Sequence, residues 1–177
     1  MIERRIGDRV LRLTVADITT VEAEAFVYDA RPDLVLGAGY GGAIAVRGGP
    51  GIQQELKGLA PVPVGGAVVS GAGKLKARHI IHAVTPKFQE EDEEAKLRAA
   101  VASALARADE LGIARLAMPA LGAGFYGMPA DRCAAILLDV ARAHLAAGRT
   151  SVLELTICLL DSRQLAAFEA ALASVPS

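Results

Sequence analysis

The stretch that decides the fold is Met118-Pro-Ala-Leu-Gly-Ala-Gly-Phe-Tyr-Gly127, a run of mostly small residues. The preceding apolar segment, Ile113 to Met118, is typical of a buried strand, and a helical pattern begins at Pro129. Glycines let the backbone approach a ligand closely, and the N-terminus of the helix adds partial positive charge. The sequence therefore predicts an anion-binding loop, with phosphate as the usual guest.

A second glycine-rich stretch, Gly37-Ala-Gly-Tyr-Gly-Gly-Ala43, also lies between an apolar run and a helical pattern. Neither loop ends in the Gly-Lys-Ser/Thr of a triphosphate-binding loop. The dinucleotide fingerprint also fails, because no acidic residue ends the next strand at the expected distance. Two such loops in one small domain suggest a ligand with two phosphates, and a pair of tight turns is the alternative.

Strand-like apolar runs alternate with helical patterns along the chain. The runs cover residues 9–15, 25–28, 67–70, 79–84, 113–118 and 152–160, and the helical patterns cover 42–56, 90–111, 129–147 and 162–172. Gly112 is expected to end the second helix, and Asp161 is expected to cap the last one. This alternation predicts one α/β domain over residues 1–177, a three-layer α/β/α sandwich with a central mixed β-sheet.

The composition excludes several classes of protein. The chain has 177 residues and a formal charge of −1, so we expect no nonspecific binding to nucleic acid. It shows neither an apolar run of about 18 residues nor the apolar segment of a signal peptide, so we expect no membrane association. Cys133 and Cys158 lack the spacing of a metal site or redox pair, and we expect small core residues in a reducing cytoplasm, with no metal and no cofactor.

Few side chains indicate chemistry by themselves. Asp17 stands where a strand gives way to a helix, so it could cap that helix or accept a hydrogen bond from an exocyclic amine such as that of adenine. His79 and His82 are three apart on a strand and point to opposite faces, which argues for packing rather than a shared metal site. Phe125 and Tyr126 could pack in the core or cover a ribose or phosphate. No arrangement of a nucleophile with a base, or of paired carboxylates, is visible.

Four motifs in order resemble the macrodomain family of ADP-ribose-binding modules over nearly the whole chain. Ala16-Asp-Ile-Thr19 resembles the family's Gly-Asp-Ile-Thr, and Gly37 to Ile44 resembles its first phosphate loop. Gly65-Gly-Ala-Val-Val69, followed by Lys76 to Pro86, is similar to its central strands. Pro119 to Gly127 is similar to its second phosphate loop, Pro-Ala-(Ile/Leu)-Ser-Thr-Gly-Ile-Tyr-Gly.

The resemblance implies a cleft for ADP-ribose. Asp17 would receive the adenine amine, with the backbone N–H of Ile18 beside it. The diphosphate would lie between two segments, Gly39-Tyr40-Gly41-Gly42-Ala43 and Gly122-Ala123-Gly124-Phe125-Tyr126.

Three departures from the family pattern bear on activity. Many members, including the MacroD-type hydrolases, carry Asn-Ala-Ala-Asn where this chain has Tyr28-Asp-Ala-Arg31, and the hydrolases carry an aspartate where it has Gly41. We expect Arg31 to pair with phosphate or to fill the pocket for the distal ribose. Leu160 replaces the aromatic residue that often stacks on adenine, which predicts weaker binding of the base.

The leading interpretation is a module that binds ADP-ribose or a related nucleotide diphosphate. The alternative is an ADP-ribosyl hydrolase that uses Asp29 as a non-standard catalytic residue. Its substrates would be ADP-ribosylated protein, nucleic acid or O-acetyl-ADP-ribose, so an ADP-ribosylated macromolecule is a candidate partner. A third interpretation is a macrodomain that has lost ADP-ribose and serves as an interaction module.

Overall fold

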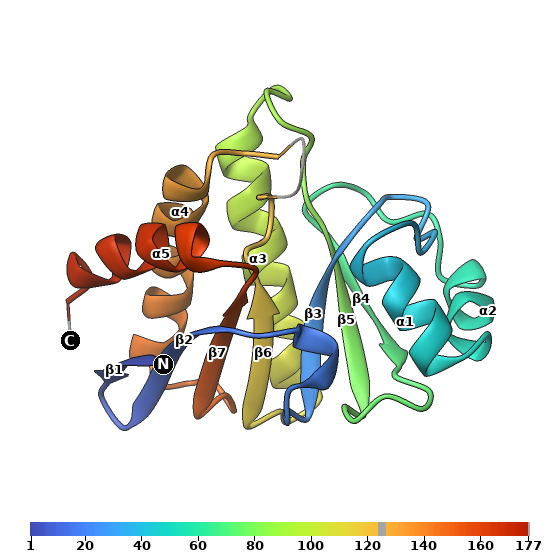
Figure 1. Cartoon of the computed structure of the whole chain (residues 1–177), viewed down its shortest axis with the longest axis horizontal. Coiled ribbons are helices and arrows are strands. Elements are labelled where there is room, and N and C mark those ends of the chain that lie inside the picture. The colour runs from blue at the N-terminus through green and yellow to red at the C-terminus, as the bar shows by residue number, and fades with distance from the viewer. Residues whose placement is uncertain (124–126, 177) are drawn as a thin grey trace.

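The computed structural model describes residues 1–123 and 127–176 (Figure 1). Within them, seven strands form one sheet in the order β1-β2-β7-β6-β3-β5-β4. The strands are β1 (Ile2–Ile6), β2 (Arg9–Val15), β3 (Ala25–Ala30), β4 (Ala67–Gly71), β5 (His79–Val84), β6 (Arg115–Pro119) and β7 (Glu154–Leu159). The five strands from β2 to β5 in this order run parallel, while β1 and β4 pair antiparallel at the two edges.

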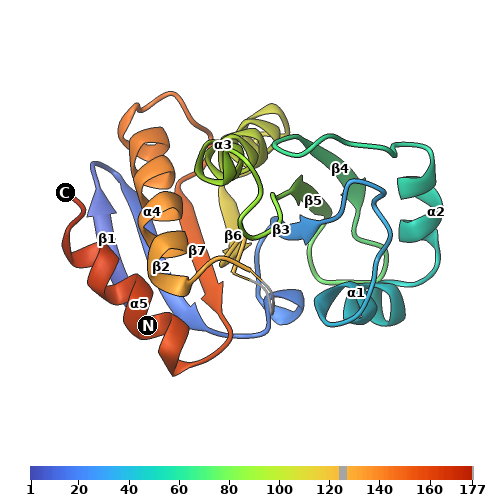
Figure 2. The same ribbon diagram turned by 90° about the horizontal axis from the view of Figure 1, so that it is seen from above.

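Helices cover both faces of the sheet. The helices α3 (Glu93–Glu110), α4 (Ala130–Ala146) and α5 (Ser162–Ala173) pack on one face around a core that includes Leu105, Leu137 and Phe168. On the other face lie α1 (Tyr40–Gly48) and α2 (Gly51–Lys57), over a second core that includes Ile44 and Phe26. Figure 2 shows α3 and α1 on opposite sides of the sheet. The predicted three-layer α/β/α fold with a mixed sheet is thereby confirmed.

The second helical layer covers only part of its face. The side chains of Arg12 and Thr14 on β2, and of Glu154 and Thr156 on β7, line a shallow depression on the sheet beside it. Arg12 bridges Glu3 and Glu154 there. The uncovered part of the sheet therefore carries paired charges beside apolar side chains such as Val21 and Leu116.

The secondary structure differs from the prediction at three places, each for a local reason. The edge strand β1 was not predicted, because its sequence Ile-Glu-Arg-Arg-Ile is mostly charged, as suits an exposed sheet edge. The helix predicted over 42–56 is two helices, since Gly49 has φ 96° and Pro50 has no N–H to continue the ladder. The strand predicted to end at Tyr28 continues to Ala30, which places Asp29 inside β3.

The parallel strands bring their carboxyl ends to one edge of the sheet, where ligands bind in sheets of this kind. The two glycine-rich loops follow β3 and β6, which are neighbours in the sheet, so they lie side by side at that edge. Along the described residues, no helix is both long enough and apolar enough to span a membrane.

Candidate functional site

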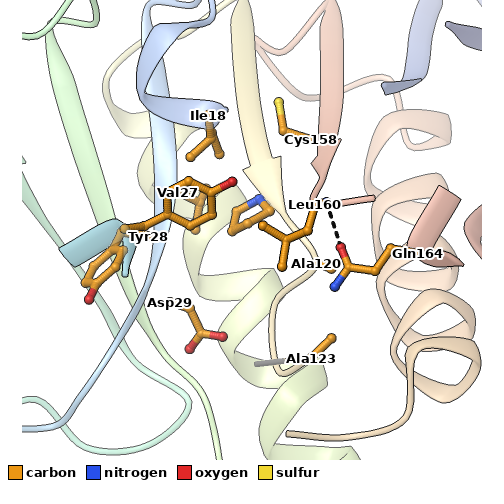
Figure 3. A pocket seen from close by; sticks show the side chains of 11 residues that line it. Ile18, Val27, Tyr28, Asp29, Ala120, Ala123, Cys158, Leu160 and Gln164 are labelled. Atoms are coloured by element: carbon orange, nitrogen blue, oxygen red, sulfur yellow. Dashed lines mark hydrogen bonds between the residues drawn. The ribbon is translucent and has the colours of Figure 1, made fainter. Parts of the chain in front are cut away.

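A cleft runs along this edge and has two parts, which share Tyr28, Asp29 and Tyr40. The inner pocket, of about 110 Å³, lies over the strand ends and is lined by Ile18, Val27, Tyr28, Asp29, Tyr40, Pro119, Ala120, Ala123, Cys158, Leu160 and Gln164 (Figure 3). The outer pocket, of about 670 Å³, is lined by Tyr28, Asp29, Ala38, Gly39, Tyr40, Thr85, Pro86, Lys87, Phe88, Gly122 and Gly127. The shared residues make the two pockets parts of one elongated site.

The first glycine loop forms one wall of the cleft and leads into α1. Gly39 has φ 63° and ψ −131°, a conformation that only glycine adopts readily. The first bond of the helix is donated by the N–H of Ala43 to the carbonyl of Gly39. The N–H groups of the first turn therefore lie at the positive end of α1, beside the part of the cleft bordered by Gly39 and Tyr40.

The second glycine loop forms the facing wall and is tied to β3 by Asp29. The N–H of Gly122 donates to Asp29 Oδ2 at 2.9 Å, and Thr85 Oγ1 donates to Asp29 Oδ1 at 2.5 Å. Asp29 lines both pockets and is partly exposed, and desolvation of its carboxylate raises its pKa against the two hydrogen bonds. Asp29 thus fastens together the ends of β3, β5 and β6. Gly124, Phe125 and Tyr126 of the same loop lie outside the described residues.

Asp17 holds the end of the cleft next to Ile18 and is half-exposed. It caps the short 3₁₀ helix η1 (Ile18–Thr20), with Oδ1 accepting from the N–H of Thr19 at 2.9 Å and from its hydroxyl at 2.7 Å. Oδ2 accepts from Arg47 Nη1 on α1 at 2.9 Å. Burial opposes ionisation of Asp17, but the hydrogen bonds from Thr19 and Arg47 outweigh it and lower its pKa. Asp17 is therefore a helix cap and an ion-pair partner at once, and Ile18 rather than Asp17 lines the inner pocket.

Leu160 and Gln164 close the other side of the inner pocket. Leu160 is 57% exposed, and its N–H donates to Gln164 Oε1 at 2.9 Å. Figure 3 shows both side chains on the side of the pocket opposite Tyr28. Gln164 was not predicted as a site residue. It lies in the first turn of α5, three residues after the helix cap Asp161, which accepts from its N–H.

Tyr28 and Gly41 are in close contact beneath the first loop. A Cβ atom built on Gly41 would overlap the Tyr28 hydroxyl and lie 3.3 Å from its Cζ. The Tyr28 ring also meets the ring of buried His82 edge-on, with centroids 5.9 Å apart. Burial and the neighbouring Asp29 raise the pKa of the Tyr28 phenol, so it is protonated at neutral pH.

The structure does not bring every predicted residue to the cleft. Arg31 is exposed, pairs with Asp33 at 2.8 Å and lines neither pocket, because Pro32 and a turn closed by the N–H of Leu34 on the carbonyl of Arg31 lead the chain away. Arg31 thus does not line the cleft in this structure, and its contact with a phosphate or with the distal ribose stays a prediction. The predicted residues that line the cleft are Ile18, Asp29, Gly39, Tyr40, Gly122, Ala123 and Leu160, while Asp17, Gly41, Gly42 and Ala43 line neither pocket.

The loop after β5 was missed as part of the site. Thr85, Lys87 and Phe88 line the outer pocket, and Phe88 is partly exposed. Their sequence gives no signal of binding by itself, since a threonine, a lysine and a phenylalanine occur on any surface loop. Only the placement of β5 beside β3 brings them to the cleft.

The cysteines and histidines behave largely as packing residues. Cys133 and Cys158 are buried free thiols, and burial raises the pKa of each to about 12, although Cys158 also lines the inner pocket. His82 Nε2 lies 2.8 Å from Ser70 Oγ, but its buried Nδ1 has no partner among the described residues, so the expected core histidine is only half satisfied. Among the described residues, no group of three or more His, Cys, Asp or Glu side chains could hold a metal ion.

The chain is similar in sequence to a known protein family and to several individual proteins. The family model described as Macro domain matches residues 29–137. A macro domain-containing protein of Streptomyces coelicolor is 38% identical over 169 residues, covering 92% of this chain and 98% of its own length. A protein of Saccharolobus solfataricus with no assigned function is 43% identical over 136 residues, covering 75% of this chain and 76% of its own.

Solved structures agree with these sequence matches. The Oceanobacillus iheyensis macrodomain with ADP superposes with a TM-score of 0.91 at 25% identity, over 97% of this chain and 94% of that one. The Trypanosoma brucei macrodomain in complex with ADP-ribose shares the fold with a TM-score of 0.85 at 22% identity, over 92% of this chain and 68% of that one. The chain, with its two glycine loops at adjoining strand ends, belongs to the Macro domain family.

Proposed function

We propose that this protein binds ADP-ribose, or a closely related adenosine diphosphate, in the cleft between the two glycine loops. The observation that carries the proposal is the pairing of these loops across Asp29, which accepts from the N–H of Gly122 while its strand leads into Gly39. The two loops border one cleft, and the N-terminus of α1 at the first loop offers N–H groups to an anion there. The solved macrodomains with ADP and with ADP-ribose support this assignment.

The chemistry of the two pockets orients the ligand. The inner pocket is mostly apolar, with Ile18 and Leu160 on either side, and suits a flat base. Asp17 lies behind Ile18 and is the acceptor for an exocyclic amine, which would share its carboxylate with Arg47. The outer pocket is larger and carries Lys87, so it suits a sugar and whatever is attached to it.

An open outer pocket also suits an ADP-ribosyl group that is still joined to a macromolecule. Lys87 and Phe88 lie beyond the glycine loops, where the attached chain would leave the cleft. We therefore include ADP-ribosylated macromolecules among the proposed partners.

Hydrolysis is the alternative activity, and Asp29 is its candidate residue. Among the described residues, Asp29 is the one carboxylate that lines both pockets, and each of its oxygens accepts a hydrogen bond from the chain itself. These bonds orient the carboxylate and leave a second lone pair on each oxygen, so they do not exclude a role as general base. Hydrolysis through Asp29 would show as ADP-ribose release from a modified protein that disappears in Asp29→Asn.

Calorimetric titration with ADP-ribose, ADP, AMP and ribose 5-phosphate tests the proposal. We expect affinity to rise from AMP to ADP, because the second phosphate reaches the paired loops, and ribose 5-phosphate to bind weakly without the base. Ala120→Leu, which narrows the inner pocket, should abolish binding, whereas Ala143→Leu on the exposed face of α4 should leave it unchanged. Parent protein that binds none of these nucleotides at millimolar concentration would contradict the proposal and favour an interaction module.

A further inference from the structure

The residue between the inner and outer pockets is Tyr28. It is one of three residues that line both, and Figure 3 shows its ring directed away from Leu160 and Gln164, on the far side of Asp29. The pairing of β3 with β5 sets Tyr28 opposite His82, whose buried ring meets it edge-on. The phenol therefore has a fixed place at the start of the outer pocket.

The Tyr28 hydroxyl occupies the space that a side chain at position 41 would need. A Cβ on Gly41 would overlap this hydroxyl, and it would also lie 3.3 Å from the backbone carbon of Leu36. Gly41 is buried in the first turn of α1, where the helix itself would favour alanine over glycine. Glycine is thus required by the phenol and not by the helix.

The polar groups around this point leave Tyr28 as a side-chain donor to the ligand. Both oxygens of Asp29 are engaged by Thr85 and Gly122. The Tyr28 hydroxyl accepts from the backbone N–H of Gly37 in the first glycine loop, and its own proton is donated to none of the described residues. The neutral phenol therefore keeps one hydrogen-bond donor for a hydroxyl group of a sugar.

We infer that Tyr28 is a specificity-determining residue, whose hydroxyl binds the sugar that follows the second phosphate and so lets the cleft distinguish ADP-ribose from ADP. This inference rests on the proposed function, because it assigns one part of that ligand to one side chain. It also gives Gly41 a role, which is to leave room for the phenol.

Tyr28→Phe tests the donor, since it keeps the ring and removes only the hydroxyl. Affinity for ADP-ribose should fall about threefold to tenfold, the range expected for one hydrogen bond, while affinity for ADP should change less than about twofold. Thermal unfolding of the variant checks that the fold is kept. Equal losses for the two ligands, or no loss for ADP-ribose, would overturn the inference while ADP binding upheld the proposed function.

Gly41→Ala tests whether the Tyr28 hydroxyl and a side chain at position 41 compete for the same space. The change is made both in the parent and in Tyr28→Phe, and its effects on binding are compared. The added methyl should displace the phenol in the parent and weaken ADP-ribose binding at least about tenfold, but should have a much smaller effect when Tyr28 is already phenylalanine. Gly51→Ala is the matched control, because nothing lies within 4 Å of a Cβ at that helical glycine. An effect of Gly41→Ala that is the same in both backgrounds would overturn the inference.

Discussion

Two aspartates border the cleft, Asp17 at its inner end and Asp29 where the two pockets join, and the structure holds them in opposite ways. Asp17 is half-exposed and pairs with a charged partner, Arg47, which helps to lower its pKa. Asp29 meets only neutral donors, Thr85 and Gly122, and desolvation raises its pKa. An exposed ion pair contributes little stability and can exchange its partner for a ligand, whereas the bonds of Asp29 join separate segments of the fold. We therefore expect Asp17 to act mainly in recognition and Asp29 mainly in architecture.

The largest effect is expected from Asp29→Ala. The change leaves the N–H of Gly122 and the hydroxyl of Thr85 without an acceptor and frees the second loop from β3. We expect a loss of about 3 kcal/mol in unfolding free energy, which lowers Tm by roughly 6–12 °C in a chain of this size. Differential scanning calorimetry measures the change in Tm. A Tm within about 2 °C of the parent would show that the hydrogen bonds of Asp29 do not hold the strand ends together as described.

Asp17→Ala should affect binding more than stability. Removing the carboxylate takes away the acceptor for the base amine and the cap of η1, and loss of such a cap costs about 1 kcal/mol. AMP and ADP-ribose should both bind at least about tenfold more weakly, because they share the base. Asp139→Ala is the control, since Asp139 also pairs with an arginine, Arg98, but on the surface of α4. Loss of ADP-ribose binding with unchanged AMP binding would contradict the role given to Asp17.

Asp29→Asn should change how the free energy of unfolding depends on pH. The pKa of Asp29 is higher in the folded than in the unfolded protein. Its contribution to the free energy of unfolding is therefore fully present below a pH of about 4, and it is lost as the pH rises through the pKa of the folded state. Asparagine can still accept from Gly122 and does not titrate. The parent should therefore lose stability relative to Asp29→Asn as the pH rises from about 4 to 8, as measured by urea unfolding. A constant difference over this range would show that the pKa is not raised.

The smallest effect is expected from Arg47→Gln. The ion pair with Asp17 is half-exposed, so its removal should cost less than about 1 kcal/mol of unfolding free energy. Asp17 Oδ2 then loses its competitor, and AMP should bind up to about threefold more tightly in a calorimetric titration. Weaker AMP binding would mean that Arg47 itself contacts the ligand.

The sequence predicts the framework of this cleft better than the connections across it. Apolar runs and glycine-rich loops report on their own surroundings, so the strands from β2 to β7 and both loops were located from local pattern. The partners of Asp29 are 56 residues away at Thr85 and 93 residues away at Gly122, and only the strand order brings them together. The ion pair of Arg47 with Asp17 could not be predicted for the same reason, because the two residues are 30 positions apart in the sequence.

Arg31 shows the opposite limit of sequence reasoning. It stands where the family pattern has the last asparagine of Asn-Ala-Ala-Asn, so the motif alone suggests a place at the cleft. In the structure, the turn from Arg31 to Leu34 buries Leu34 and leaves the arginine exposed with Asp33. Tyr28, whose side chain was not singled out, has the central place instead.

The first strand, β1, and the last helix, α5, suggest a practical use. Arg4 on β1 donates to the carbonyl of Val175 at 2.5 Å, and Figures 1 and 2 show both termini beside β1 and α5, away from the glycine loops. A fluorescent reporter or a surface linker joined at either end would therefore leave the mouth of the cleft clear. The same scaffold could be immobilised as a nucleotide sensor, with its response tuned by the residue at position 28.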